Sequence, residues 1–317
     1  MQRSNHVTPL ELPLFAERNV SIDLLRLDLI HPQISGNKWF KLKYNLRQVG
    51  VSGVDRVLSF GGAWSNHIHA LAYAGMQQGF ETVGVIRGEE PAVYSQTLED
   101  ARRWGMRLHF VSRELYREKN STEFIGRLEA MFGPFVLVPE GGSNAPAVQG
   151  CAEILSHVEH PEEYQYICSA CGTGATLAGL IASKTTGGKV LGVPVLKGAE
   201  FLYEDIASLL NQAGVSDPGG WQLLLDSHEG GYAKVSPELA DCLDRFCRMT
   251  GIELEPVYTG KLMLALERKL LRGEFPAGSR ILMVHTGGMQ GLRGMRSQLI
   301  KQLKRFKNSY NVGKTSA

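Results

Sequence analysis

The strongest constraint on the fold is an alternation of short apolar segments with longer segments whose apolar residues recur at helical spacing. Four short apolar runs lie between residues 56 and 138, and stretches long enough for a helix separate them. Parallel strands need crossovers of about a dozen residues or more, whereas antiparallel strands can be joined by tight turns. The alternation resumes at residue 164 and continues to a final helix after Gly291. The pattern predicts an α/β fold with two lobes, each a mostly parallel sheet flanked by helices.

Apolar periodicity, and glycine residues that can end helices, delimit the individual elements. The expected strands are 56–60, 81–87, 106–111, 135–138, 164–169, 190–195, 222–226 and 280–284. The expected helices are 39–48, 67–78, 95–104, 121–132, 175–184, 200–213, 236–249 and 261–272. The chain has 317 residues, enough for two compact lobes. A cleft between two such lobes is the default ligand site.

Charge and cysteine content exclude several classes of partner. The formal net charge is +2, whereas a nucleic-acid or anionic-membrane partner usually requires a concentrated basic surface. The one basic run, at Lys301, Lys304, Arg305 and Lys307, is expected to be the solvated face of the last helix. No segment reaches the roughly 18 apolar residues of a membrane span, and no secretory signal is recognised. Five cysteines without such a signal indicate reduced thiols, so a cytoplasmic protein is expected.

Three turns rich in glycine or hydroxyl residues occur where strands are expected to give way to helices. They are Gly61–His67, Cys171–Thr176 and His285–Gly291. In the second turn, glycines let backbone N–H groups converge at a helix N-terminus, and two threonines add hydroxyl donors. This turn is predicted to bind an anion, best a phosphate, although a tight turn without a ligand is the alternative. A dinucleotide fingerprint is excluded because Leu177 occupies its third glycine position.

Lys38 follows Ser35-Gly36-Asn37 at the start of an expected helix. A cation is unfavourable there because the helix dipole is positive at its N-terminus. The same potential favours a neutral amine, and burial would lower the pKa of the lysine further. Schiff-base formation requires a neutral amine. The residues alone leave a solvated surface lysine as the alternative.

The segment from Ser35 to Leu42 resembles the cofactor-lysine segment of the 1-aminocyclopropane-1-carboxylate (ACC) deaminase and D-cysteine desulfhydrase family. That family belongs to the tryptophan-synthase-β-like (type II) pyridoxal-phosphate (PLP) enzymes. The resemblance covers nearly the whole chain, and its other matching segments are Ser65–His67, Gly172–Thr176, Pro256–Lys261 and His285–Gly288. It implies PLP in the cleft between a large domain of residues 1–49 and 157–317 and a small domain of residues 50–156. With it we expect a homodimer.

The resemblance also implies a role for each matching residue. Lys38 is expected to hold the cofactor as a Schiff base and to move the proton at the substrate Cα. Tyr258 should lie against the pyridine ring, and Asn66 should bind the phenolic oxygen of the cofactor. Thr286 should meet the pyridine nitrogen through its hydroxyl group. A hydroxyl group does not force that nitrogen to stay protonated, which favours elimination over transamination.

The remaining expected contacts concern the phosphate and the substrate. The residues expected to hold the phosphate are Lys41, Gly172, Thr173, Gly174, Ala175 and Thr176. The residues expected to contact the substrate are Trp64, Ser65, Asn66 and His67. Together, Lys38, Ser65 and Tyr258 form the expected catalytic set, and the only other expected partner is a small amino-acid substrate.

Two positions bear on which substrate the chain takes. ACC deaminases proper carry Glu directly after the active-site Tyr, and Leu at the position of Thr286, whereas this chain has Thr259 and Thr286. The resemblance therefore implies a PLP-dependent lyase that converts D-cysteine to pyruvate, ammonia and sulfide. In this α,β-elimination, Lys38 takes the Cα proton and sulfide leaves Cβ. The alternatives are an ACC deaminase that forms 2-oxobutanoate and ammonia, a related D-amino-acid lyase, and a non-catalytic PLP-binding protein.

Two departures from the family pattern affect the pocket. Trp64 stands where well-studied members have Gln, and Ala233 ends a segment that reads Gly-Tyr-Gly in the family. Separately, Cys168 and Cys171 have C-x-x-C spacing, but no second ligand pair exists. They are expected to be buried packing residues, and no metal is expected.

Overall fold

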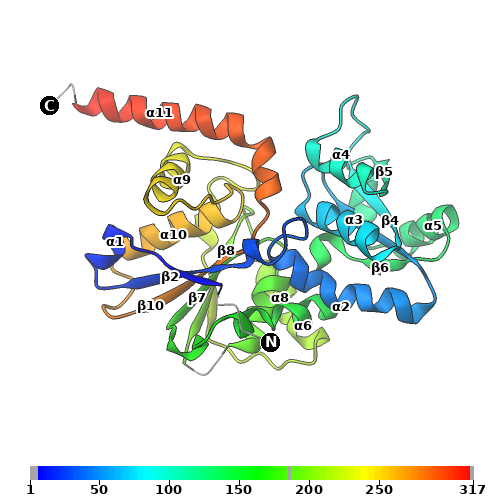
Figure 1. The fold of residues 1–317 in the computed structure, drawn as a ribbon, viewed down its shortest axis with the longest axis horizontal. Coiled ribbons are helices and arrows are strands. Elements are labelled where there is room, and N and C mark those ends of the chain that lie inside the picture. The colour runs from blue at the N-terminus through cyan, green and yellow to red at the C-terminus, as the bar shows by residue number, and fades with distance from the viewer. Residues whose placement is uncertain (1–5, 185–186, 315–317) are drawn as a thin grey trace.

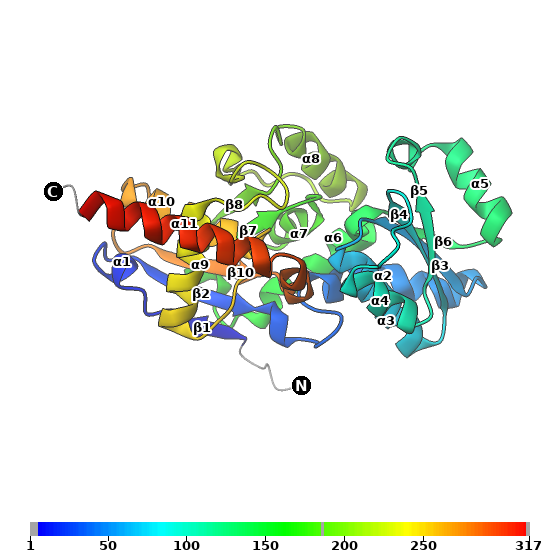
Figure 2. The same cartoon turned by 90° about the horizontal axis from the view of Figure 1, so that it is seen from above.

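The computed structural model describes residues 6–184 and 187–314, and Figures 1 and 2 show two α/β lobes side by side. The larger sheet has, in spatial order, β1 (Val7–Pro9), β2 (Ser21–Arg26), β10 (Arg280–His285), β7 (Tyr166–Cys171), β8 (Lys189–Pro194) and β9 (Trp221–Leu223). β1 is antiparallel to β2, and the other neighbouring pairs are parallel.

The smaller sheet is parallel throughout. Its strands, in spatial order, are β5 (Arg107–Val111), β4 (Glu81–Arg87), β3 (Arg56–Gly61) and β6 (Val136–Val138). The predicted fold class, two mostly parallel sheets flanked by helices, is therefore confirmed. The carboxyl ends of β3, β7 and β10 lead into the three glycine-rich turns that the sequence singles out.

The helices with the smaller sheet are α3 (Asn66–Gln78), α4 (Gln96–Arg103) and α5 (Thr122–Phe132). The helices with the larger sheet are α1 (Pro13–Ala16), α6 (Ala145–Cys151), α7 (Ala175–Ser183), α8 (Leu202–Gln212), α9 (Pro237–Thr250), α10 (Thr259–Leu271) and α11 (Arg296–Lys314). α2 (Asn37–Ser52) joins the two lobes, because Phe40 packs in a core of the larger sheet and Leu42 and Leu46 pack in a core of the smaller one.

Side-chain caps explain why several helix starts are readable from the sequence. The hydroxyls of Ser65, Ser95, Ser121 and Ser236 each accept a hydrogen bond from the backbone N–H three residues later, at the starts of α3, α4, α5 and α9. Such caps satisfy N–H groups that have no partner inside the helix. The expected and observed starts of these helices agree closely for this reason.

The N-terminal strands β1 and β2 and the short helix α6 are not among the expected elements. In β2, an acidic residue, Asp23, interrupts the apolar run and hides the strand pattern. Its carboxylate is buried and accepts hydrogen bonds from the Tyr164 hydroxyl at 2.6 Å and from Arg280 at 3.3 Å. Both partners are distant in sequence, so only the tertiary fold supplies the hydrogen bonds that allow Asp23 to be buried in this strand.

The packing of α6 bears on the expected domain boundary at residue 156. Its residues Ala147, Val148 and Cys151 are buried in a core shared with β7 and β8 of the larger sheet. We therefore propose that the smaller lobe ends near residue 144 and that α6 belongs with the larger lobe.

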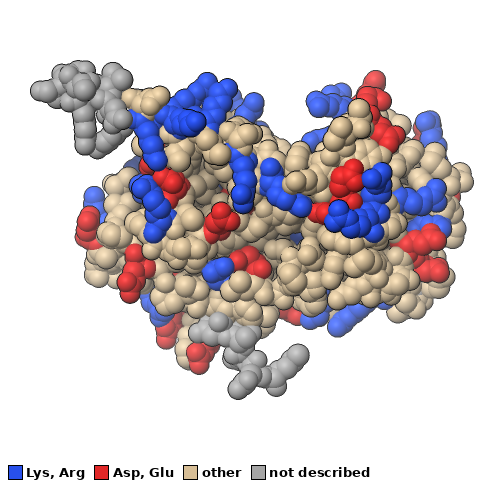
Figure 3. Space-filling view, turned by 45° about the horizontal axis from the view of Figure 1, so that its top comes forward, with Lys and Arg blue, Asp and Glu red and all other residues tan. Residues whose placement is uncertain are grey.

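The C-terminal helix α11 carries the basic run. Lys301, Lys304, Arg305 and Lys307 are exposed on it, as expected, and Figure 3 shows Lys and Arg side chains gathered at that end of the molecule. Over the described ranges, no helix has both the length and the apolar content needed to cross a membrane.

Candidate active site

A cavity of about 440 Å³ lies between the two lobes, at the carboxyl ends of strands from both sheets. It brings together all but one of the site residues expected from the sequence. Those that line it are Lys38, Lys41, Trp64, Ser65, Asn66, His67, Gly172, Thr173, Gly174, Thr176, Tyr258 and Thr286. The exception is Ala175, which is fully buried as the first residue of α7.

Lys38 lies in the first turn of α2, where the chain approaches the end of β10 closely. Gly36 has a φ of 66°, and a Cβ there would lie 1.9 Å from the carbonyl oxygen of Thr286. That carbonyl accepts a hydrogen bond from the Asn37 backbone N–H at 3.1 Å. Only glycine fits such a turn. The Lys38 ammonium donates to Asn37 Oδ1 at 2.9 Å and faces the cavity.

Burial, together with the charge of nearby Lys41, lowers the pKa of Lys38 from its usual 10.5 to about 7. Burial also lowers the pKa of Lys41. A neutral amine is therefore readily available at Lys38 near pH 7, which is the state that attacks a carbonyl.

The turn between β7 and α7 forms an anion cradle. Gly174, at a φ of 85°, is the N-cap of α7, and no acidic side chain lies in the first turn. The Lys41 ammonium donates to the Gly141 carbonyl at 3.0 Å and lies 3.4 Å from Thr173 Oγ1. Thr176 Oγ1 accepts from Asn37 Nδ2 at 2.9 Å, and Thr176 lines the cavity. These donors suit a phosphate.

The N-terminus of α3 supplies a second group of polar atoms. Ser65 caps the helix by accepting from the Ile68 N–H at 3.2 Å. Asn66 Oδ1 is buried and has no hydrogen-bond partner among the described residues, and an amide in such a position indicates a missing ligand. His67 is fully buried and its Nε2 lies 2.9 Å from Ser59 Oγ. Burial, together with Lys38 and Lys41, holds the pKa of His67 well below its usual range.

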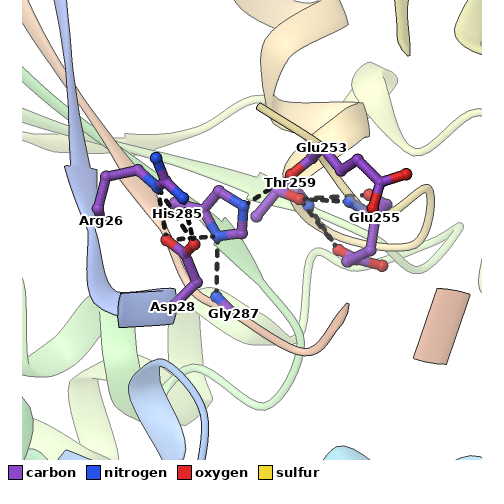
Figure 4. A network of polar contacts seen from close by, with 7 residues as sticks. All are labelled: Arg26, Asp28, Glu253, Glu255, Thr259, His285 and Gly287. Atoms are coloured by element: carbon purple, nitrogen blue, oxygen red, sulfur yellow. Dashed lines mark hydrogen bonds and ion pairs between the residues drawn. The ribbon is translucent and has the colours of Figure 1, made fainter. Parts of the chain in front are cut away.

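Tyr258 and Thr286 are held by a buried polar network that the sequence did not reveal (Figure 4). The carboxylate of Glu255 accepts from the backbone N–H groups of Val257, Tyr258 and Thr259 at 2.6–2.7 Å. Burial nevertheless raises the pKa of Glu255 to about 7. Glu255 thus takes the place of a cap at the start of α10 and orients Tyr258 towards the cavity.

His285 performs a similar task on the other side of the network. The Gly287 N–H donates to His285 Nδ1 at 3.1 Å, so the ring proton is on Nε2, which donates to the Glu253 carbonyl at 3.1 Å. Burial lowers the pKa of His285, which favours this neutral form. The ring therefore links the Thr286-Gly287 turn to the segment that leads to Tyr258.

Thr259, the residue after the active-site Tyr that the resemblance uses to distinguish the substrates, does not reach the cavity. Its side chain is fully buried, and its Oγ1 accepts from the Glu255 N–H at 3.0 Å. Trp64 does line the cavity, where it is partly exposed and packs so closely on Gly294 that a Cβ there would lie 2.8 Å from the indole. A substrate is therefore affected by Trp64 directly and by Thr259 only through Tyr258.

Among the lining residues to which the sequence assigned no role, those with polar side chains are Asn37, Arg87, Glu140 and Tyr232. Arg87 ends a strand that the sequence does predict, so a ligand-facing position at the carboxyl end of a parallel strand was a usable signal. Cys168 and Cys171 are buried in β7, where burial raises the pKa of both thiols. In the part of the chain that the structure describes, no group of three or more His, Cys, Asp or Glu is arranged to hold a metal ion.

The site residues fit PLP on their own geometry. A half-buried lysine, a phosphate cradle and an asparagine with an unpaired amide oxygen line one cavity that is large enough for a cofactor and a small substrate. The cradle and the lysine come from different segments of the larger lobe, while the asparagine comes from the smaller lobe.

Comparisons with known proteins agree with this fit. The sequence matches the family described as "Pyridoxal-phosphate dependent enzyme" over residues 2–287. The bifunctional D-cysteine desulfhydrase/1-aminocyclopropane-1-carboxylate deaminase of Arabidopsis thaliana is 28% identical over 294 residues, which cover 84% of this chain and 72% of the relative. The D-cysteine desulfhydrase of Yersinia pestis is 28% identical over 316 residues, which cover 93% of this chain and 95% of the relative.

The fold agrees with the same grouping. A solved structure described as an ACC deaminase homologue aligns with a TM-score of 0.82 at 26% identity, covering 94% of this chain and 93% of that chain. The chain therefore belongs to the pyridoxal-phosphate dependent enzyme family, as a homologue of ACC deaminases and D-cysteine desulfhydrases that shares their fold and cofactor.

Proposed function

We propose that this protein is a PLP-dependent lyase that carries out α,β-elimination on a small amino acid, with D-cysteine as the favoured substrate. The observation that carries the proposal is the half-buried Lys38 amine, with a pKa lowered to about 7, in a cavity that also presents a phosphate cradle. The products are pyruvate, ammonia and sulfide, after one water molecule is added.

The proposed cofactor contacts follow from the geometry described above. Lys38 would hold the cofactor covalently, and Tyr258 would lie against its ring. The N-terminus of α7 would hold the phosphate, because Thr173 and Thr176 line the cavity there and Lys41 adds a positive charge. The amide N–H of Asn66 would donate to the phenolic oxygen. When bound, the cofactor withdraws electrons from the substrate Cα and so makes the Cα proton acidic.

The remaining steps belong to side chains of this chain. The helix N-terminus at Ser65 and Asn66 binds the substrate carboxylate, because its positive end lies at the cavity and its first turn has no acidic residue. Lys38 takes the proton from Cα as a neutral amine, and the Cβ–S bond then breaks with its electron pair leaving on sulfur. The Thr286 hydroxyl faces the ring nitrogen without imposing a charge on it.

ACC deamination is the second candidate, and the name of the Arabidopsis relative supports keeping it. ACC has no removable proton at Cα, so ring opening requires a different arrangement of acid and base. The Thr286 hydroxyl favours elimination, whereas the position of Thr259 outside the cavity removes one of the two arguments against ACC.

A pyruvate assay on the purified holoenzyme tests this proposal. D-Cysteine, L-cysteine, D-serine and ACC are supplied in turn, with sulfide measured alongside the oxo acid. We expect pyruvate and sulfide in equal amounts from D-cysteine, and little 2-oxobutanoate from ACC. Thr286→Leu should lower turnover of D-cysteine more than it lowers cofactor affinity. Turnover of ACC with none of D-cysteine would reverse the order of the two candidates.

A further inference from the structure

Arg87 is an exposed cation on the cavity wall that forms no ion pair with any of the residues that the structure describes. The charged residues that line the cavity are Lys38, Lys41, Arg87 and Glu140. The two lysines are engaged in the proposed cofactor site, and Glu140 lies 3.4 Å from the Lys119 ammonium. The Arg87 guanidinium makes no ion pair or hydrogen bond with any described residue. It lies over the Tyr116 ring, with its Cζ 5.7 Å from the ring centroid.

The position of Arg87 places it on the substrate side of the cavity. It is the last residue of β4, next to the end of β3, where Ile86 is in register with Gly61. A Cβ on Gly62 would lie 3.8 Å from Arg87 Nη2. The guanidinium therefore lies over the beginning of the turn that carries Ser65 and Asn66, while the phosphate cradle belongs to a different turn, after β7.

The substrate carboxylate already has a separate place in this arrangement. The N-terminus of α3, with no acidic residue in its first turn, attracts that group. Arg87 is then left facing whatever the substrate carries beyond Cα. A neutral side chain would leave the exposed guanidinium to water, whereas an anionic one would form a charge-assisted hydrogen bond with it.

We propose that Arg87 binds a second anionic group on the substrate, so that amino acids with a charged β-substituent are preferred to neutral ones of the same size. The proposal rests on the proposed β-elimination and extends it to phosphate, sulfonate or thiolate leaving groups. With O-phosphoserine, Lys38 takes the Cα proton and the Cβ–O bond breaks with its electron pair leaving on phosphate. Water then completes the conversion to pyruvate and ammonia.

The experiment compares isosteric ligands on the holoenzyme. Dissociation constants for aspartate and asparagine, each as the D and the L form, are measured from the change in visible absorption of the cofactor. We expect the wild type to bind aspartate more tightly than asparagine in the productive enantiomer. Arg87→Gln should weaken aspartate binding about five-fold or more, with little effect on asparagine. Arg87→Lys should retain part of the preference because it keeps the charge.

Arg113→Gln is the matched control. Val111 is the register partner of Arg87, and Arg113 follows it at the same edge of the sheet, exposed and outside the cavity lining. This variant should bind both ligands as the wild type does, because it removes the same charge without touching the cavity.

Three outcomes would overturn the proposal. An equal loss of affinity for aspartate and asparagine in Arg87→Gln would indicate that Arg87 binds the α-carboxylate instead. The absence of any preference in the wild type, or of any binding of either ligand, would contradict a second anion site. Turnover provides a separate readout, because O-phospho-D-serine against D-serine tests the same preference. A preference for aspartate in an enzyme that releases no pyruvate from D-cysteine would refute the proposed reaction but not the anion site.

Discussion

At the scale of single residues, the protonation of Lys38 is the property that the fold alters most usefully. A solvent-exposed lysine amine is almost wholly charged at neutral pH. Burial and the neighbouring Lys41 charge lower the pKa of Lys38 to about 7, so a large fraction is neutral there. The low pKa has an energetic cost to folding that is fully present below pH 7 and is relieved as the pH rises towards 10.5.

This shift predicts how the apoenzyme captures PLP. The rate of covalent capture should rise between about pH 6 and pH 8 and then level off, because nearly all Lys38 side chains are neutral above that range. The measurement is the growth of cofactor absorption after mixing, at a series of pH values. Lys38→Ala should show no covalent capture. A midpoint near pH 10, or borohydride labelling of another lysine, would contradict the assignment of Lys38.

At the scale of elements, the start of α2 depends on its close contact with the end of β10. Gly36 turns the chain at a φ of 66°, with the Thr286 carbonyl in the place of a Cβ, and the next N–H donates to that carbonyl. The same contact places Lys38 beside Thr286, so the cofactor lysine and the proposed ring-nitrogen contact are positioned together. His285 supports this arrangement by accepting the Gly287 N–H.

Replacing Gly36 with Ala should therefore damage both stability and the cofactor site. We expect the free energy of unfolding to fall by at least about 2 kcal/mol, from backbone strain and from the clash with a backbone carbonyl. Urea unfolding of the apoenzyme and the visible spectrum of the holoenzyme are the measurements. The control is Gly50→Ala in the same helix, where a Cβ meets nothing within 4 Å. This control should raise the free energy of unfolding by up to about 1 kcal/mol. Equal changes in the free energy of unfolding for the two variants would refute the close contact at Gly36.

At the scale of the whole molecule, few polar contacts join the mouths of the two lobes. Arg293, in the 3₁₀ turn Met289–Gly294 of the larger lobe, forms an ion pair with Asp100 of α4 at 2.8 Å. The two side chains are 33% and 16% exposed, so solvent screens the pair only in part. The neighbouring contact of Trp64 with Gly294 joins the same 3₁₀ turn to the turn that precedes α3 in the smaller lobe. These contacts set how closely the lobes approach each other over the cavity.

Removing this ion pair should affect substrate binding more than stability. Arg293→Gln should raise KM for the substrate about three-fold or more, while stability changes by about 1 kcal/mol or less, as expected for a partly exposed pair. Hydrogen exchange of the α4 backbone amides should become faster. Arg248→Gln is the control, because Arg248 pairs with Asp244 within α9 of the larger lobe at 2.9 Å. An unchanged KM in Arg293→Gln would show that the pair does not hold the lobes together.

Much of the architecture is readable from local sequence. Most strands and helices follow from apolar periodicity, and serine caps define several helix starts because a cap is a contact over only three residues. The glycine-rich turn Cys171–Thr176 and the position of Lys38 at a helix start also indicate their chemistry locally. The segments that resemble the family then led correctly to the cofactor.

The tertiary structure decided what depends on partners far along the chain. Strand β2 is stable because Tyr164 and Arg280 satisfy its buried Asp23, and neither partner is visible in the segment itself. Thr259 is next to Tyr258 in sequence but turns away from the cavity to bond Glu255. The sequence could show that Arg87 ends a strand, but not that it lines a cavity and forms no ion pair with another described residue. Burial and pairing of polar groups are set by the whole fold, because each requires atoms from other elements to replace water.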